Sequence, residues 1–293
     1  MQLVEIVAPE FDLEKTLDSG QVFHWEKVGS GFVGLIGDRA VYLEQQNDKL
    51  RVANDCAELV ARYFALDHPL EEICRSFPRD PAMNAAQEFC RGLRIIRQPK
   101  WECLATFICS SMKQVAHIRQ ISFALRTRFG EKRKISDRAV FTFPSAQRIA
   151  ESSERELREC ALGYRAKNLL ATARRISDGE VDLERLATQS DLHLREALCE
   201  LPGVGAKVAN CVMLFAYERL RAFPIDVWIE RVLRESYFPR SRKLNAGRLR
   251  RFTQEYFGDH GGYAQQYLFH YARTQASASG HRRRSRNLSR RGR

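Results

Sequence analysis

The hydrophobic pattern of this sequence changes once, near Ala57, and this change limits the fold more than any other feature. Before it, short runs of valine, leucine and aromatic residues at 21–27, 31–36 and 39–45 are separated by Gly and Asn-Asp pairs that favour turns. From Ala57 to about residue 275 the apolar residues recur with the helical period, and the breaks contain proline or glycine. We therefore expect an α+β fold, in which an antiparallel β-sheet precedes a mostly α-helical core.

The C-terminal end differs from the rest of the chain. An SASG run is followed by HRRRSRNLSRRGR, which has seven arginines and no acidic residue. Because this end shows no helical or strand period, we expect it to be disordered in isolation. A solvated end and a nucleic-acid-binding arm both fit it. The expected domains are a β-rich domain at 1–90, a helical core at 91–275 and a disordered basic tail at 276–293.

Composition narrows the class of protein. The formal net charge is +12, and the body of the chain stays basic without its tail, which suits a polyanionic partner. No run of eighteen apolar residues and no signal-peptide pattern is present, so we expect an intracellular protein without membrane contact. The eight cysteines form no CxxC pair, which favours buried thiols over zinc or iron–sulfur sites. We expect neither metal nor cofactor.

The segment 191–218, DLHLREALCELPGVGAKVANCVMLFAYE, reads as two helices joined by a very tight hairpin. The apolar face of the first helix stops at Pro202, and the second helix carries Val208, Cys211 and further apolar residues at helical spacing. Glycines in the turn allow a close approach of another molecule. The N–H groups at the start of the second helix then suit an anion such as a DNA phosphate.

Lys207 lies in the first turn of that second helix, beside its apolar stripe. A helix N-terminus and partial burial both disfavour a charged amine, and a neutral amine is a nucleophile. The ordinary alternative is a solvated surface lysine. Nineteen residues later, Asp226 precedes another helical run, where a carboxylate either caps the helix or stabilises a cationic sugar. The residues alone leave both roles of Asp226 open.

Together, the hairpin, Lys207 and the following Pro-x-Asp resemble the helix-hairpin-helix glycosylase superfamily. Four further motifs are similar to the 8-oxoguanine DNA glycosylase family in particular. They are SGQVFHW at 19–25, RQPKWECLATFICSS at 97–111, LGYRAKNL at 162–169 and GYAQQYLF at 262–269. These motifs occur in the family's order and span nearly residues 1–275.

The resemblance implies a bifunctional DNA glycosylase and AP lyase. Lys207 would attack the sugar C1′ and form a covalent imine, Asp226 would support departure of the base, and β-elimination would nick the strand. The expected partner is double-stranded DNA containing an oxidised purine, 8-oxoguanine or a ring-opened purine, bound by a monomer.

The resemblance also places four residues at the pocket for the flipped base. Phe269 and Cys211 would sandwich the ring, and Gln265 would bind its pairing edge. The carbonyl of Gly20 would accept from N7–H, which 8-oxoguanine has and guanine lacks. Plain core packing is the alternative for Phe269 and Cys211.

Other expected DNA contacts follow the family with three departures. Met112, Lys113 and His117 stand where eukaryotic members have an asparagine-rich run and an arginine that read the opposite cytosine. Met112 can wedge the duplex but cannot read cytosine, and Trp228 replaces a histidine that contacts the backbone. The remaining expected contacts match the family: Tyr164, Arg165, Gly203, Val204 and Gly205.

Two rival functions are open. An alkylpurine glycosylase of the same superfamily uses the aspartate alone, so Lys207 argues against it. A non-catalytic DNA-binding protein would need the hairpin but neither Lys207 nor Asp226. The iron–sulfur branch is excluded, because no cysteine follows Cys211.

Overall fold

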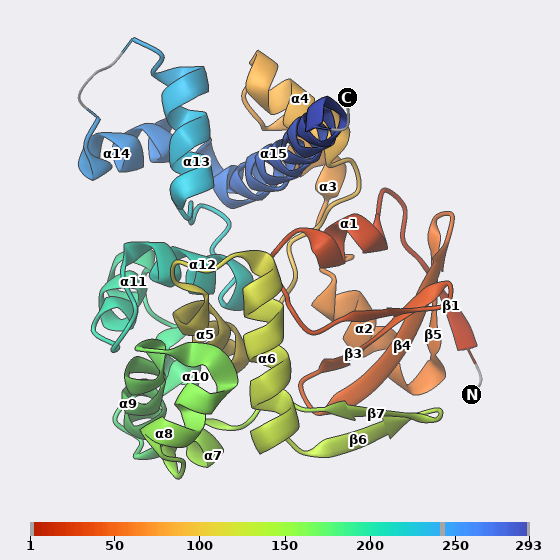
Figure 1. The fold of residues 1–293 in the computed structure, drawn as a ribbon, viewed down its shortest axis with the longest axis vertical. Helices are drawn as coiled ribbons and strands as arrows, with labels where there is room; N and C mark the ends of the chain where they lie inside the picture. Colours follow the sequence, from red (N-terminus) through yellow and green to blue (C-terminus); the bar gives the residue numbers. More distant parts are fainter. Residues whose placement is uncertain (1–2, 241–243, 292–293) are drawn as a thin grey trace.

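The computed structural model describes the backbone of residues 3–240 and 244–291. Its N-terminal part is a five-stranded antiparallel sheet of order β1-β5-β4-β3-β2 (Figure 1). The strands are β1 (Leu3–Val7), β2 (Glu26–Val28), β3 (Gly31–Ile36), β4 (Arg39–Gln46) and β5 (Lys49–Ala53). Alternate residues of β4 and β5, Val41 with Leu43 and Leu50 with Val52, are fully buried. They share a core with helices α1 (Leu13–Asp18) and α2 (Ala57–Tyr63), as a sheet with one solvated face requires.

The sheet confirms the expected antiparallel fold but differs in its strands. The expected strand at 21–27 is reduced to β2, because Gln21 leaves the ladder for side-chain contacts. Its amide donates to the Arg94 carbonyl (2.8 Å) and accepts from the Ile96 N–H (2.7 Å). Strand β5 pairs with β1 on one side and with β4 on the other, and neither pairing was expected from the sequence.

The rest of the described chain is mainly helical, as predicted. Its helices are α3 (Leu70–Arg75), α4 (Pro81–Phe89), α5 (Lys100–Ser110), α6 (Val115–Phe129), α7 (Ala146–Ala150), α8 (Glu154–Leu157), α9 (Arg165–Ser177), α10 (Leu183–Leu186), α11 (Asp191–Cys199), α12 (Ala206–Ala216), α13 (Val227–Val232), α14 (Ala246–Tyr256) and α15 (Gly261–Arg291). Short 3-10 or π-helical turns are η1 (Asn54–Cys56), η2 (Arg158–Leu162), η3 (Leu233–Tyr237) and η4 (Gly258–His260).

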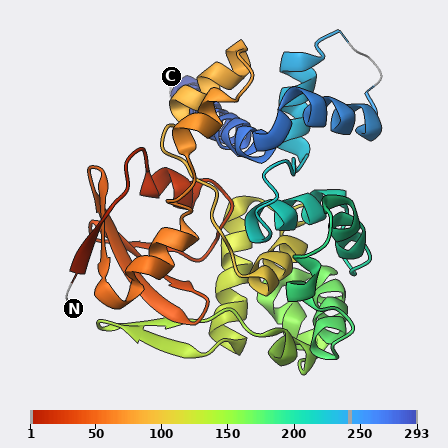
Figure 2. The same ribbon diagram turned by 180° about the vertical axis from the view of Figure 1, so that it is seen from behind.

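These helices form two groups that share one hydrophobic core. Helices α5 to α12 form one group, and α3, α4, α13, α14 and α15 form the other (Figure 1). In both ribbon views α6 lies between the sheet and the helices α7 to α11 (Figure 2). Within the described residues, no helix is both long and apolar enough to cross a membrane.

Two elements contradict the sequence-based expectation. A β-hairpin of β6 (Lys132–Ile135) and β7 (Arg138–Phe141) interrupts the helical region and packs on β3 and β4. Its strands are rich in charged residues, so their strand period was weak. The second is the C-terminal end, where α15 continues to Arg291 although no helical period was found there, since alanine and arginine extend a helix at little cost; the tail expected at 276–293 stays a prediction. The boundary proposed near residue 90 stays a prediction.

Candidate active site and DNA-binding face

The hairpin between α11 and α12 is held by contacts that require glycine. Gly203 has φ of +84°, and a Cβ there would lie 2.9 Å from the Cβ of Asn168 in α9. The Val204 N–H donates to the Leu201 carbonyl (3.0 Å), which closes the turn. Thr172, also in α9, donates to the Pro202 carbonyl (3.0 Å). Helix α9 therefore fixes the position of the hairpin.

The N-terminus of α12 faces open space. Gly205 is its N-cap and has no side chain to accept from the first N–H groups. A Cβ built on Gly205 would meet no atom within 4 Å. Val204 is buried, so it can offer only its backbone to a ligand. The backbone of Gly203 to Gly205 thus has the geometry of a phosphate site.

Lys207 is half-buried against aromatic side chains. Its Nζ lies 5.1 Å from the centroid of the Phe107 ring in α5, and that ring stacks on Phe215 at 5.5 Å. One turn later on the same face is Cys211. Burial raises the pKa of its thiol, and the nearby Lys207 opposes part of that rise. The structure therefore brings Lys207 and Cys211 together, with the lysine packed against the core rather than solvated.

Asp226 caps α13 and also lies close to Lys207. Its carboxylate accepts from the N–H groups of Trp228 (3.1 Å) and Ile229 (2.9 Å). Burial raises the pKa of Asp226, while the two N–H groups and the Lys207 ammonium oppose that rise. The two readings of this residue are therefore compatible, because the cap holds the carboxylate beside the lysine.

Gly20 and Phe269 meet although 249 residues separate them in the chain. Gly20 has φ of +84°, and a Cβ there would lie 3.1 Å from Cε1 of Phe269 in α15. The Ser19 carbonyl accepts from the amide of Gln266 (2.8 Å), which ties this segment to α15. Gln265 lies one turn before Phe269 and is 4% exposed. Its buried Oε1 has no hydrogen-bond partner among the described residues.

An ion cluster behind Gly20 was not anticipated from the sequence. Arg273 donates to the Asp18 carbonyl, and its guanidinium lies 5.7 Å from the centroid of the Phe269 ring. Arg119 of α6 forms an ion pair with the Asp18 carboxylate (2.8 Å). Asp18 therefore links α6 and α15 to the turn at Gly20. Arg273 lies one helical turn after Phe269, the spacing that could have indicated it.

The loop between α5 and α6 projects an apolar side chain into solvent. Met112 is 91% exposed and has φ of +53°, which is unusual for a side chain other than glycine. Lys113 beside it is half-buried, and His117 is exposed on α6. Such an exposed methionine can reach a DNA duplex, and its role as a wedge stays a prediction.

The structure gives Arg165 internal partners, and the expected contact of Arg165 with DNA stays a prediction. Arg165 is 6% exposed and donates to the carbonyls of Ser111 (2.8 Å) and Leu162 (3.2 Å). It therefore supports the Met112 loop from inside. The neighbouring Tyr164 is 56% exposed, with the Arg165 guanidinium 4.4 Å from its ring centroid. Trp228 is partly buried, and its ring lies 5.3 Å from the Arg231 guanidinium.

Two family models match consecutive parts of the chain. Residues 3–104 match the 8-oxoguanine DNA glycosylase N-terminal domain, and residues 105–255 match the HhH-GPD superfamily of base excision DNA repair proteins.

Similar proteins cover nearly the whole chain. An N-glycosylase/DNA lyase from Arabidopsis thaliana is 32% identical over 91% of this chain and 78% of its own length. A probable N-glycosylase/DNA lyase from Methanothermobacter thermautotrophicus is 29% identical over 92% of this chain and 96% of its own. The Clostridium acetobutylicum 8-oxoguanine glycosylase/lyase, solved with DNA containing cytosine opposite 8-oxoguanine, superimposes with a TM-score of 0.87. That chain is 29% identical and the match covers 94% of this chain and 99% of the other. The protein therefore belongs to the 8-oxoguanine DNA glycosylase family of the helix-hairpin-helix superfamily.

Proposed function

We propose that this protein removes 8-oxoguanine from duplex DNA and then cleaves the strand at the resulting abasic site, using Lys207 as the nucleophile. The observation that carries the proposal is that Lys207, in the first turn after the hairpin, acts electrostatically on the fixed, largely buried carboxylate of Asp226. The hairpin can hold a phosphate while the lysine reaches the adjoining sugar. The N-glycosylase/DNA lyases that resemble this chain over nearly its full length support the same activity.

The reaction starts with attack on C1′ of the damaged nucleotide. Lys207 first loses its ammonium proton, its amine nitrogen then bonds to C1′, and the bond from C1′ to the base breaks with its electron pair leaving on the base, which takes up a proton. Asp226 stabilises the positive charge on the sugar, because its carboxylate is fixed by two backbone N–H groups. The bond from C1′ to the ring oxygen then breaks, the ring oxygen takes up the proton that the nitrogen loses, and C1′ and the nitrogen form the imine. Removal of a C2′ proton forms a C2′=C3′ double bond, and the phosphate leaves from C3′ with the electron pair of its C3′–O bond.

Base selection follows from Gly20, Gln265 and Phe269. Phe269 offers a ring for stacking beside Gly20. The Gly20 carbonyl accepts from N7–H, which is present only in the oxidised base. The buried Gln265 Oε1 lacks a partner within the described residues, and a donor on the pairing edge of the base would satisfy it. Ring-opened purines also present a donor near this carbonyl, so we include them as substrates.

The exposed Met112 fills the space that the flipped base leaves, supported from below by Arg165. We place the activity inside the cell, where the DNA is: in the cytoplasm and nucleoid of a bacterium, or in the nucleus of a eukaryote.

Borohydride trapping tests the proposed chemistry. The wild-type protein and Lys207→Gln are each incubated with an 8-oxoguanine duplex and sodium borohydride, and the covalent complex is resolved by electrophoresis. We expect trapping and excision by the wild type and neither by the variant, which should still bind the duplex. Excision without trapping would assign the reaction to water activated by Asp226 alone, as in the rival alkylpurine enzymes. Trapping by the variant would assign the imine to another amine.

A further inference from the structure

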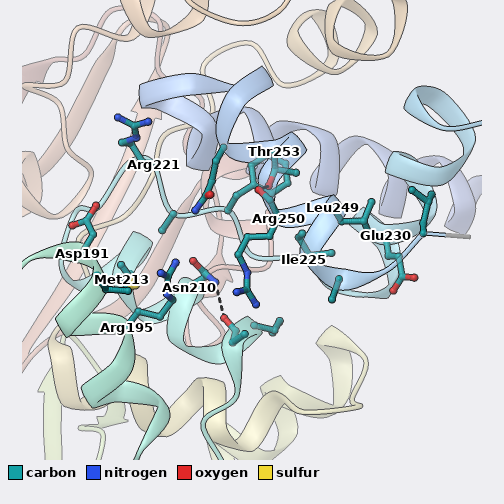
Figure 3. Close-up of a pocket in the computed structure, with 18 residues that line it drawn as sticks. Asp191, Arg195, Asn210, Met213, Arg221, Ile225, Glu230, Leu249, Arg250 and Thr253 are labelled. Carbon is teal, nitrogen blue, oxygen red and sulfur yellow. Dashed lines mark hydrogen bonds between the residues drawn. The ribbon is translucent and has the colours of Figure 1, made fainter.

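A cavity of about 530 Å³ lies on the side of α12 that faces α14. Lys207 lines it, but none of the four base-pocket residues does. Its walls come from α11, α12, α13 and α14 and from the segment at 221–225 (Figure 3). It is therefore a separate space beside the catalytic lysine, and the base-excision steps above do not use it.

The charged groups around this cavity are unevenly paired. Asp191 is bound by Arg219 (3.2 Å), Glu230 by Arg234 (2.7 Å), and Arg221 by Asp259 (2.9 Å). Besides Lys207, the remaining cations are Arg195 and Arg250, and neither has an ion pair or a side-chain hydrogen bond with any described residue.

These two arginines face each other across the cavity. Arg195 comes from α11 and Arg250 from α14, and both side chains point into the space between these helices (Figure 3). Arg221 points away from it, in keeping with its ion pair. Two guanidinium groups without acidic partners in a concave site attract an anion that can accept several hydrogen bonds.

Apart from Asn210, Thr253 and Gln254, the uncharged lining is apolar. Leu192, Ile225, Leu244 and Leu249 form much of the wall, together with Met213 of α12. An anion with an apolar neighbour fits this combination better than a bare inorganic ion does. A DNA backbone has that chemistry, since each phosphate is joined to a deoxyribose.

The cavity is continuous with the hairpin. Ala206, the first residue of α12, lines it together with Lys207. A strand held at the hairpin N–H groups, with one sugar at Lys207, therefore passes the cavity mouth.

We propose that Arg195 and Arg250 form a second backbone clamp, which binds phosphates of the damaged strand next to the nucleotide that Lys207 attacks. The proposal rests on the proposed function, because only the attack by Lys207 identifies the bound strand as the damaged one. It adds a site on the far side of α12 from the base pocket. The clamp fixes the sugar between two phosphate contacts, one at the hairpin and one at the arginines.

Salt-dependent binding tests the clamp with a matched control. Arg250→Gln and Arg251→Gln each remove one charge from adjacent exposed positions of α14, but Arg251 does not line the cavity. Affinity for a duplex carrying a tetrahydrofuran abasic analogue is measured from 50 to 200 mM salt with the full chain. Each lost phosphate contact lowers the slope of log affinity against log salt by about 0.9. We expect a fall of that size for Arg250→Gln, about twice as much with Arg195→Gln added, and little for Arg251→Gln.

A second measurement assigns the strand. Single neutral methylphosphonates are placed along the damaged or the opposite strand, and binding is compared between the wild type and the Arg195→Gln/Arg250→Gln variant. At the clamped phosphate the neutral substitution should weaken the wild type but not the variant, because the contact is already lost. The Arg195→Lys/Arg250→Lys variant keeps both charges and should retain most of the slope.

Equal slopes for Arg250→Gln and Arg251→Gln would overturn the clamp, as would coupling confined to the opposite strand. The proposed function is tested separately: if the wild type gives no covalent complex with borohydride, the proposed function is wrong. A protein that traps normally but shows equal slopes refutes only the clamp.

Discussion

Replacing Asp226 by asparagine separates its structural role from its chemical role. An asparagine amide oxygen can accept from the Trp228 and Ile229 N–H groups as the carboxylate does. Asparagine and aspartate cap helices about equally well, whereas alanine costs about 1 kcal/mol. Burial raises the pKa of Asp226, so the stability linked to its proton is present at low pH and lost as the pH rises through the folded pKa. A neutral amide therefore costs no stability at pH 7.

The expected result is a variant that folds but does not react. Removal of one preorganised electrostatic group lowers catalytic rates about 10²- to 10³-fold, or about 3 to 4 kcal/mol. Thermal unfolding at pH 7 should place Asp226→Asn at or above the wild type and Asp226→Ala about 2 to 4 °C lower. Single-turnover excision of 8-oxoguanine should fall in both variants. Wild-type excision by Asp226→Asn would reduce this residue to a helix cap, and equal destabilisation of both variants would refute the capping argument.

Three further predictions concern DNA binding. Gly203→Ala should lose about 1 to 2 kcal/mol of folding stability, because Gly203 has φ of +84° and a Cβ there would contact α9. Gly205→Ala should unfold at the same temperature as the wild type but bind an abasic-analogue duplex more weakly, because its Cβ would project into open space. With Met112 and His117 in place of residues that read cytosine, single-turnover rates opposite the four bases should differ less than about a hundredfold; a larger cytosine preference would mean that other residues read the partner base. Truncation after Gly280 removes seven arginines, so the slope of log affinity against log salt should fall by about 2 to 4, and superimposable slopes would leave the tail without a DNA role.

The spacing of residues along the sequence predicted those parts of the fold that depend only on residues close together in the chain. The hairpin at Gly203 to Gly205 and the cap at Asp226 each depend on a few neighbouring residues, and the structure has both where the sequence indicated them. The change from strand to helical period near Ala57 likewise gave the order of sheet and helices. In these cases the relevant atoms lie within one or two turns of chain.

The differences arise where distant segments decide the outcome. Gln21 leaves the sheet to bond a segment more than seventy residues away, so its β-forming neighbours could not predict β2. Arg165 matches a DNA-contacting motif, yet its side chain turns inward because the Ser111 carbonyl lies within reach. Arg273 of α15 meets Asp18 of α1 only in the assembled fold, across more than 250 residues of chain. At such positions the sequence gives the residue type, but the direction of the side chain and its partners depend on the assembled fold.

The two sides of α12 support the proposed role of Lys207 as the nucleophile. Toward α5, its Nζ contacts the Phe107 ring and the buried Cys211. Toward α14, the same residue lines the cavity that holds Arg195 and Arg250. The atom under attack, C1′, is the one that joins a base to its backbone. A nucleophile for that atom must lie where the proposed base site and backbone site meet, and Lys207 borders both Cys211 and the cavity. Movement of α12 should therefore change binding and chemistry together, whereas changes at Arg250 should act through binding.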